Sequence, residues 1–165
     1  GIGKTKSILL FDTLLNKLTD DEILAAISHE VGHSELKHMW VDLFISLLKA
    51  GVYIGLFYLL TLSNILLEAF KVDRMLAVTI IGFLILISPI NMLLKVLSNT
   101  VSRKAEFDAD SYSHNFQLDK AMITALKKVS RENLGNLTPH PLFVVMKYNH
   151  PPVSARITHI KKGTN

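Results

Sequence analysis

The 165-residue chain contains no cysteine. Disulfide bonds and cysteine-ligated metal sites are therefore excluded, and a zinc site would have to be built from histidines and carboxylates. The chain also lacks a basic stripe interleaved with aromatic residues, and its formal net charge is only +4. We therefore expect no nucleic-acid partner and interpret a lipid bilayer as the anionic surface that a mildly basic chain would meet.

The sequence starts with Gly1-Ile2-Gly3 and not with a methionine or a signal-peptide pattern, and it has no internal repeats or low-complexity segments. We interpret residues 1–165 as a single C-terminal region of a longer membrane protein. On this interpretation, N-terminal transmembrane helices of the same protein are missing from the sequence and would be partners of this region.

Apolar residues are concentrated in two long runs, residues 41–63 and 75–97. These runs explain how a chain with 19% charged residues reaches a mean hydropathy of +0.32. Each run is long enough to cross a bilayer as a helix, and the short link between them predicts a transmembrane hairpin. Lys and Arg are in excess on the flanks, which the positive-inside rule places in the cytosol. Two buried helices of a soluble bundle are the alternative.

Residues 29–33 read His-Glu-Val-Gly-His, a spacing that suits zinc hydrolysis. On a helix, positions i and i+4 share one face, so His29 and His33 can bind one metal ion. Glu30 lies beside them and can act as a general base toward water. Thr19 with Glu22 forms a capping-box pattern, which predicts a helix over residues 20–38. A surface helix with two histidines is the alternative.

A catalytic zinc takes three protein ligands, and the best third candidate lies just beyond the second apolar run. A helix predicted over residues 99–115 would place Glu106 and Asp110 on one face. Glu106 can ligate the metal, and Asp110 can support a ligating histidine. The hairpin would return this helix to the side that carries the two histidines. An ordinary solvated acidic face is the alternative.

Further helices are predicted over residues 119–134 and 152–161. The predicted fold is therefore all-α, an integral membrane helical protein with a two-helix transmembrane hairpin inserted between the zinc-ligand helices. The other histidines outside the site are interpreted as structural or loop residues: His38, His114, His140 and His159. For His114, a role in a polar network around Asp110 stays open.

Together these patterns resemble the CaaX prenyl protease type 1 family of integral-membrane zinc metalloproteases. The resemblance covers essentially the whole chain. It is carried by the hairpin, by the 29–33 motif and by four further segments: Phe11-Asp12-Thr13-Leu14-Leu15, Ser102-Arg103-x-x-Glu106-Phe107-x-Ala109-Asp110, Glu132-Asn133-Leu134 and Tyr148-Asn149-His150-Pro151-Pro152-x-x-x-Arg156.

The resemblance implies one Zn²⁺ per chain, bound by His29, His33 and Glu106, with Glu30 as the general base. Asp110 would either orient a ligand or donate a proton. Two C-terminal residues would contact the substrate or the developing oxyanion: His150 and Arg156.

The implied function is that of a zinc metalloendopeptidase that removes the C-terminal -aaX tripeptide from prenylated CaaX proteins. The implied location is the endoplasmic reticulum membrane, with the active site accessible from the cytosol. A prenyl chain partitions into membranes, so such a protease would meet its substrate there. Two alternatives stay open: a heat-shock-type membrane quality-control zinc protease, and a non-catalytic membrane fragment that binds lipid or a partner helix.

Overall fold

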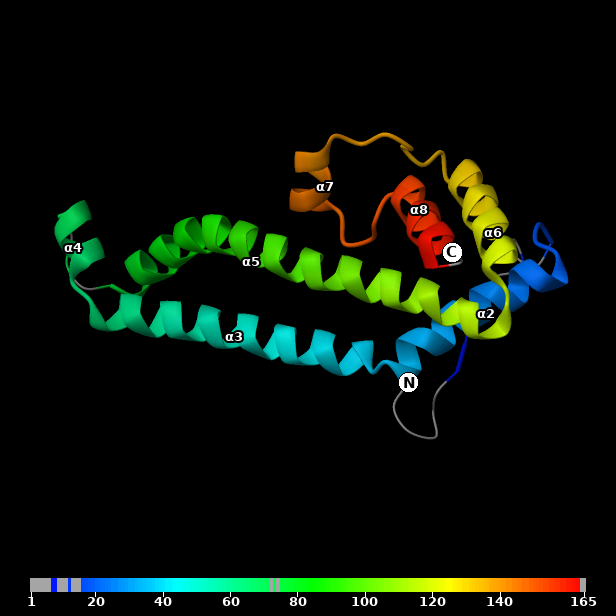
Figure 1. The fold of residues 1–165 in the computed structure, drawn as a ribbon. Coiled ribbons are helices and arrows are strands. Elements are labelled where there is room, and N and C mark those ends of the chain that lie inside the picture. Colours follow the sequence, from blue (N-terminus) through cyan, green and yellow to red (C-terminus); the bar gives the residue numbers. More distant parts are fainter. Residues whose placement is uncertain (1–6, 9–11, 13–15, 72, 74, 164–165) are drawn as a thin grey trace. The chain divides into compact units, whose positions relative to one another are not determined.

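The computed structural model describes residues 7–8, 12, 16–71, 73 and 75–163. Every regular element among them is a helix, which confirms the predicted all-α fold (Figure 1). The chain forms two compact units: Gly1–Met39 with Asn99–Asn165, and Trp40–Ser98. Most of the Phe11–Leu15 segment lies outside the described residues.

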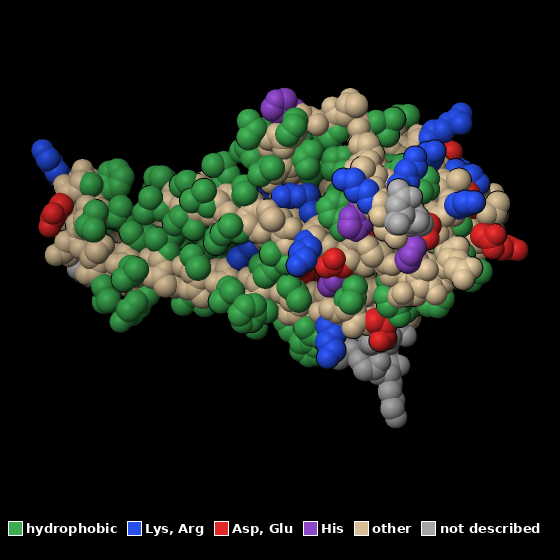
Figure 2. Space-filling view, in the orientation of Figure 1, with side chains coloured by type: hydrophobic (Ala, Val, Ile, Leu, Met, Phe, Trp, Pro, Cys, Tyr) green, Lys and Arg blue, Asp and Glu red, His purple; other side chains and the backbone are tan. Residues whose placement is uncertain are grey.

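The unit Trp40–Ser98 is the predicted hairpin. It contains most of α3 (His38–Leu62), the short helix α4 (Ile65–Phe70) and the first part of α5 (Leu76–Tyr112). Both α3 and α5 are long and apolar enough to cross a membrane, and their most apolar stretches are 0% and 6% buried by protein. Figure 2 shows hydrophobic side chains covering this unit. Buried helices of a soluble bundle would not expose such a surface to water, so the hairpin interpretation is favoured.

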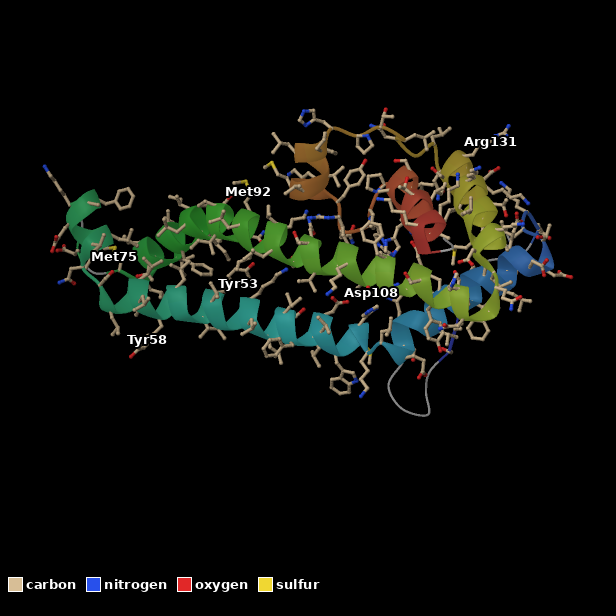
Figure 3. The ribbon with its side chains drawn as sticks, viewed as in Figure 1. Tyr53, Tyr58, Met75, Met92, Asp108 and Arg131 are labelled. Atoms are coloured by element: carbon tan, nitrogen blue, oxygen red, sulfur yellow. The ribbon has the colours of Figure 1, made fainter. Side chains whose placement is uncertain are left out.

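Polar and aromatic contacts align the two long helices of the hairpin. The Lys49 ammonium donates to the Ser98 hydroxyl at 2.7 Å, and the Tyr53 hydroxyl donates to the Asn91 side-chain oxygen at 2.9 Å. Tyr53 lies between α3 and α5 in Figure 3. The lysine within the first apolar run therefore has a partner inside the hairpin, as a charge at membrane depth requires.

The other unit surrounds a small core where α2, α6 and α8 meet through Ala25, Met122 and Ile160. Its elements are α2 (Asp20–Glu35), the end of α5, the 3₁₀ helix η2 (Ser113–Phe116), α6 (Asp119–Glu132), α7 (Pro141–Lys147) and α8 (Val153–Gly163).

The N-terminal end of α2 forms as its sequence predicts. The Glu22 N–H donates to the Thr19 hydroxyl at 3.4 Å, and the Thr19 N–H donates to the Glu22 carboxylate at 2.8 Å. The C-terminal end differs from the predicted boundary at residue 38. Helix α2 ends at Glu35, because Lys37 adopts the left-handed conformation with a φ of 58°, and α3 then starts at His38.

Three other boundaries differ from those expected. The stretches 75–97 and 99–115 belong to one continuous helix, α5, because neither glycine nor proline separates them. Helix α6 ends at Glu132 and not at residue 134, and Leu134 adopts the left-handed conformation with a φ of 48°. The C-terminal helix runs from Val153 to Gly163. The short helices α4 and α7 were not predicted.

Candidate metal centre

Three metal-binding side chains from α2 and α5 converge on one point. The Nε2 atoms of His29 and His33 are 3.2 Å apart, one helical turn separating the two residues. Glu106 presents one carboxylate oxygen 3.4 Å from His33 Nε2 and the other 3.6 Å from His29 Nε2. All three ligand atoms lie within 4.8 Å of one another. Two imidazoles and a carboxylate at this spacing fit a catalytic zinc, which takes three protein ligands of these types.

Gly32 allows α2 to lie close enough to α5 for this convergence. A Cβ atom at this position would lie 2.8 Å from the Tyr112 Cβ and 3.2 Å from both the Cα and the carbonyl oxygen of Ala109. Such distances are shorter than van der Waals contact, so a larger residue would push the two backbones apart. The glycine of the pentapeptide therefore sets the distance between the histidines and Glu106.

Asp110 orients the first histidine. The His29 Nδ1 atom lies 3.0 Å from one Asp110 oxygen, and the Asp110 side chain is completely buried. If Nδ1 carries the proton and donates it to this carboxylate, the lone pair of Nε2 points toward His33 and Glu106. The contact therefore selects the tautomer and the ring orientation that metal binding requires.

Arg156 of α8 binds Asp110 from the other side. Its Nε donates to one carboxylate oxygen at 2.8 Å and its Nη2 to the other at 2.5 Å, a bidentate pair. The same guanidinium lies 3.3 Å from a Glu106 oxygen and is only 13% exposed. The resemblance implied substrate or oxyanion contact for Arg156, which stays a prediction. The contacts in the structure are with the two buried carboxylates.

His38 contacts the second histidine, a role that sequence reasoning missed. The Nδ1 atoms of His38 and His33 are 2.9 Å apart. If His33 binds a metal through Nε2, its Nδ1 would carry the proton and His38 Nδ1 would accept the hydrogen bond. The only sequence signal was a histidine five positions beyond the pentapeptide. The left-handed turn at Lys37, which places His38 there, is not encoded by a glycine.

The surroundings keep Glu106 ionised, as a metal ligand must be. Its burial opposes the charge, but hydrogen bonds with His150 and His33 and the nearby Arg156 hold the pKa of this carboxyl well below its usual range. The Nδ1 atom of His150 lies 3.0 Å from the carboxylate. This contact with Glu106 raises the pKa of His150, although partial burial opposes the rise.

Seven site residues were predicted from the sequence. Direct contacts in the structure connect six of them: His29, His33, Glu106, Asp110, His150 and Arg156. The seventh, Glu30, directly follows His29 on α2 and is exposed. The His150 side chain is also largely exposed, at 62%. Two other histidines lie away from the centre, His114 paired with Asp119 at 2.8 Å and His159 hydrogen-bonded to Ser111 at 2.9 Å.

Residues 1–164 match the model of peptidase family M48. The chain belongs to this family. It is 32% identical over 163 residues to a CAAX prenyl protease 1 homolog of Oryza sativa subsp. japonica, which covers 98% of this chain and 38% of that protein. It is 31% identical over 170 residues to the uncharacterized metalloprotease YhfN of Bacillus subtilis, covering 100% of this chain and 40% of that one.

The fold is also similar to a solved structure, that of Ste24p from S. mikatae. The TM-score is 0.80 at 25% sequence identity, with 95% of this chain and 40% of the Ste24p chain covered. The M48 chain described here therefore spans about two fifths of the length of these relatives. The comparisons confirm the predicted resemblance and place the chain in a metalloprotease family with an all-helical membrane fold.

Proposed function

We propose that this chain carries the zinc centre of a membrane metalloendopeptidase that removes the -aaX tripeptide from prenylated CaaX proteins. One observation carries the proposal, the convergence of two histidine Nε2 atoms and a Glu106 oxygen within 4.8 Å. His29, His33 and Glu106 would hold one Zn²⁺ per chain. When bound, zinc would polarise the scissile carbonyl and lower the pKa of water, and three protein ligands leave a fourth position open for these groups.

Glu30 is proposed as the general base. It would take a proton from the attacking water and pass it to the leaving amine. Its position next to His29 and its exposure favour this role, because the base must reach both the water and the substrate. His150 would donate a hydrogen bond to the developing oxyanion, since its raised pKa favours the protonated form.

Asp110 is proposed as an orienting residue and not as a proton donor. Burial alone would raise the pKa of Asp110, but hydrogen bonds with Arg156 and His29 lower it. The group therefore stays ionised at neutral pH and has no proton to give. Arg156 would keep both buried carboxylates neutralised and so hold the ligand set in place.

The substrate class is proposed from the relatives and from the apolar hairpin. Several relatives are named CAAX prenyl proteases, and a prenylated chain end partitions into the bilayer that α3 and α5 would cross. We propose the endoplasmic reticulum membrane as the location, with the centre accessible from the cytosol. A quality-control protease that ignores prenylation is the second candidate, since the Bacillus relative is named only as a metalloprotease.

The test is Glu30→Gln in the membrane-reconstituted protein, with zinc content and cleavage of a farnesylated CaaX peptide measured together. We expect zinc to stay bound and cleavage to fall by about 10²- to 10⁴-fold, as for loss of a general base. Glu35→Gln, an exposed glutamate on the same helix, is the matched control and should keep full activity. Undiminished cleavage by Glu30→Gln would refute the proposal, and equal cleavage of an unprenylated peptide would favour the quality-control protease.

A further inference from the structure

Helix α7 and the loop before it expose apolar side chains although they lie outside the hairpin. Figure 2 shows hydrophobic side chains gathered over α7. Contiguous apolar surface of this kind on a folded unit marks an interaction site. Five side chains make up this apolar patch, each between 36% and 65% exposed: Leu137, Leu142, Phe143, Val145 and Met146.

Two side chains of α5 hydrogen-bond to the backbone of α7 and of the residue after it. The Arg103 guanidinium donates to the carbonyl oxygens of Val144 at 3.2 Å and Tyr148 at 2.8 Å. The Asn99 amide, which is almost completely buried, donates to the carbonyl of Met146 at 3.3 Å. The Met146 and Tyr148 carbonyls have no further helical N–H to bond and are satisfied in this way, whereas the Val144 carbonyl also accepts from the Tyr148 N–H at 3.1 Å. These hydrogen bonds hold α7 in one place while its apolar side chains stay at the surface.

The attachment points follow the apolar run of α5 directly. That run ends at Leu97, and α5 continues without a break through Asn99 and Arg103. At a rise of 1.5 Å per residue, these two residues lie about 3 and 9 Å further along the helix axis. Interfacial helices lie at this level, with their apolar faces buried by about 5–10 Å in the boundary between headgroups and acyl chains.

Lysines flank the attachment in the sequence, as is typical of the end of a membrane span. Lys95 and Lys104 lie on this part of α5, and Lys147 ends α7. Long cationic side chains at this depth reach headgroup phosphates, while apolar and aromatic residues beside them enter the acyl region. The combination of an apolar patch with a basic border fits a lipid surface better than a second protein.

We propose that α7 is a lipid-contacting element, with its apolar patch inserted at the membrane boundary where α5 leaves the bilayer. The same short segment leads through Tyr148 to His150, which contacts Glu106. Lipid binding by α7 therefore holds one side of the metal centre at the membrane surface. The proposal requires only that α3 and α5 span the bilayer, and it is independent of the peptidase chemistry.

Because the chain has no cysteine, a single label can report on α7. The variant Leu142→Cys, labelled with bimane, is reconstituted in phosphatidylcholine–phosphatidylserine vesicles. Quenching is measured with nitroxides near the top of the acyl chains and, separately, with iodide in the water. Lys127→Cys on α6 is the exposed control, and Leu84→Cys, 61% exposed on α5, calibrates quenching within the bilayer.

For position 142 we expect quenching by the shallow nitroxide and iodide quenching at least about twofold weaker than at position 127, as for an interfacial helix. Strong iodide quenching without nitroxide quenching would show α7 in water and overturn the proposal. Protection from both quenchers would show that protein covers the patch and would also overturn it. Zinc content and cleavage by the unlabelled protein separate either result from a failure of the proposed function.

Discussion

The two units of the molecule differ in what they expose and what they bury. The hairpin helix α3 has no buried residue and exposes its apolar side chains, which a bilayer would cover. The unit that carries the metal centre buries few large apolar side chains and many polar ones: Glu22, Ser28, Asn99, Glu106, Asp110, Ser113 and Ser130. The hairpin therefore depends on its surroundings for stability, whereas the metal centre depends on complete pairing of its buried charges.

Substitution of Arg156 is the strongest test of whether the metal-centre unit depends on its buried ion pairs. It is the cation that contacts both Asp110 and Glu106, and all three side chains are buried or nearly so. In Arg156→Met the two carboxylates lose this partner, and removal of one member of a buried ion pair costs about 3–5 kcal/mol. We expect thermal unfolding to show a loss of this size, together with weak zinc binding.

Two further variants test the reason for that loss. Arg131→Met removes an exposed arginine, labelled on α6 in Figure 3, and should leave the unfolding temperature unchanged. Adding Asp110→Asn to Arg156→Met removes one unpaired charge and should recover part of the stability. A stable Arg156→Met protein would show that the buried network does not hold this unit together.

Glycine-to-alanine substitutions should have opposite effects in the two units. In Gly32→Ala the new Cβ would meet the Tyr112 side chain and the Ala109 backbone, and overpacking of this kind costs about 1–3 kcal/mol. Zinc affinity should fall too, because the histidines move away from Glu106. Thermal unfolding and chelator competition measure the two effects.

Gly51→Ala in α3 is the matched control. An added Cβ there would meet nothing within 4 Å, and alanine is favoured over glycine inside a helix by about 0.5–1 kcal/mol. We expect unchanged or higher stability and unchanged zinc binding. A loss at position 51 as large as that at position 32 would mean that the difference in packing between the units has no energetic effect.

The features that depend on helical spacing or on the length of an apolar run could be predicted from the sequence. The i, i+4 spacing placed His29 beside His33, and the same spacing put Glu106 and Asp110 on one face. The length of the apolar runs predicted the hairpin. Each of these features depends on one element at a time, so no knowledge of tertiary packing was needed.

The remaining features depend on contacts between distant segments or on short elements. The bidentate pair of Arg156 with Asp110 joins residues 46 positions apart. The role of His38 depends on a left-handed turn at Lys37, where no glycine or asparagine signals it. Helix α7 has only seven residues and follows Pro139 and His140, a segment that predicts a turn.

Loss of the His38 contact with His33 should have a smaller effect on the metal centre. Loss of a hydrogen-bonding partner of a ligating histidine typically weakens metal binding by about 10- to 100-fold. In His38→Ala we expect zinc affinity at the low end of that range, because His33 keeps its contact with Glu106. Chelator competition gives the affinity. His114→Ala, which removes an exposed histidine paired with Asp119, should leave it unchanged, and an equal loss in both variants would contradict a specific role for His38.

The smallest expected effect is the pH dependence at the start of α2. Burial would raise the pKa of Glu22, but hydrogen bonds from Lys128 and the Thr19 N–H lower it to about 2. A carboxyl with a lowered pKa in the folded state stabilises the protein above its ordinary pKa of 4.5, and this contribution is lost as the pH falls toward 2.

Glu22→Gln keeps the cap acceptor but removes the charge that Lys128 contacts at 2.6 Å. We expect the variant to be less stable at pH 7 by about 1 kcal/mol, because Lys128 is partly exposed and the pair is screened. The difference should shrink between pH 4.5 and pH 2, because in that range Glu22 becomes protonated in the unfolded wild-type chain while it stays largely ionised in the folded protein. Thermal unfolding at pH 7 and pH 3 measures this change. A constant difference would mean that the cap, and not the charge, carries the contribution of Glu22.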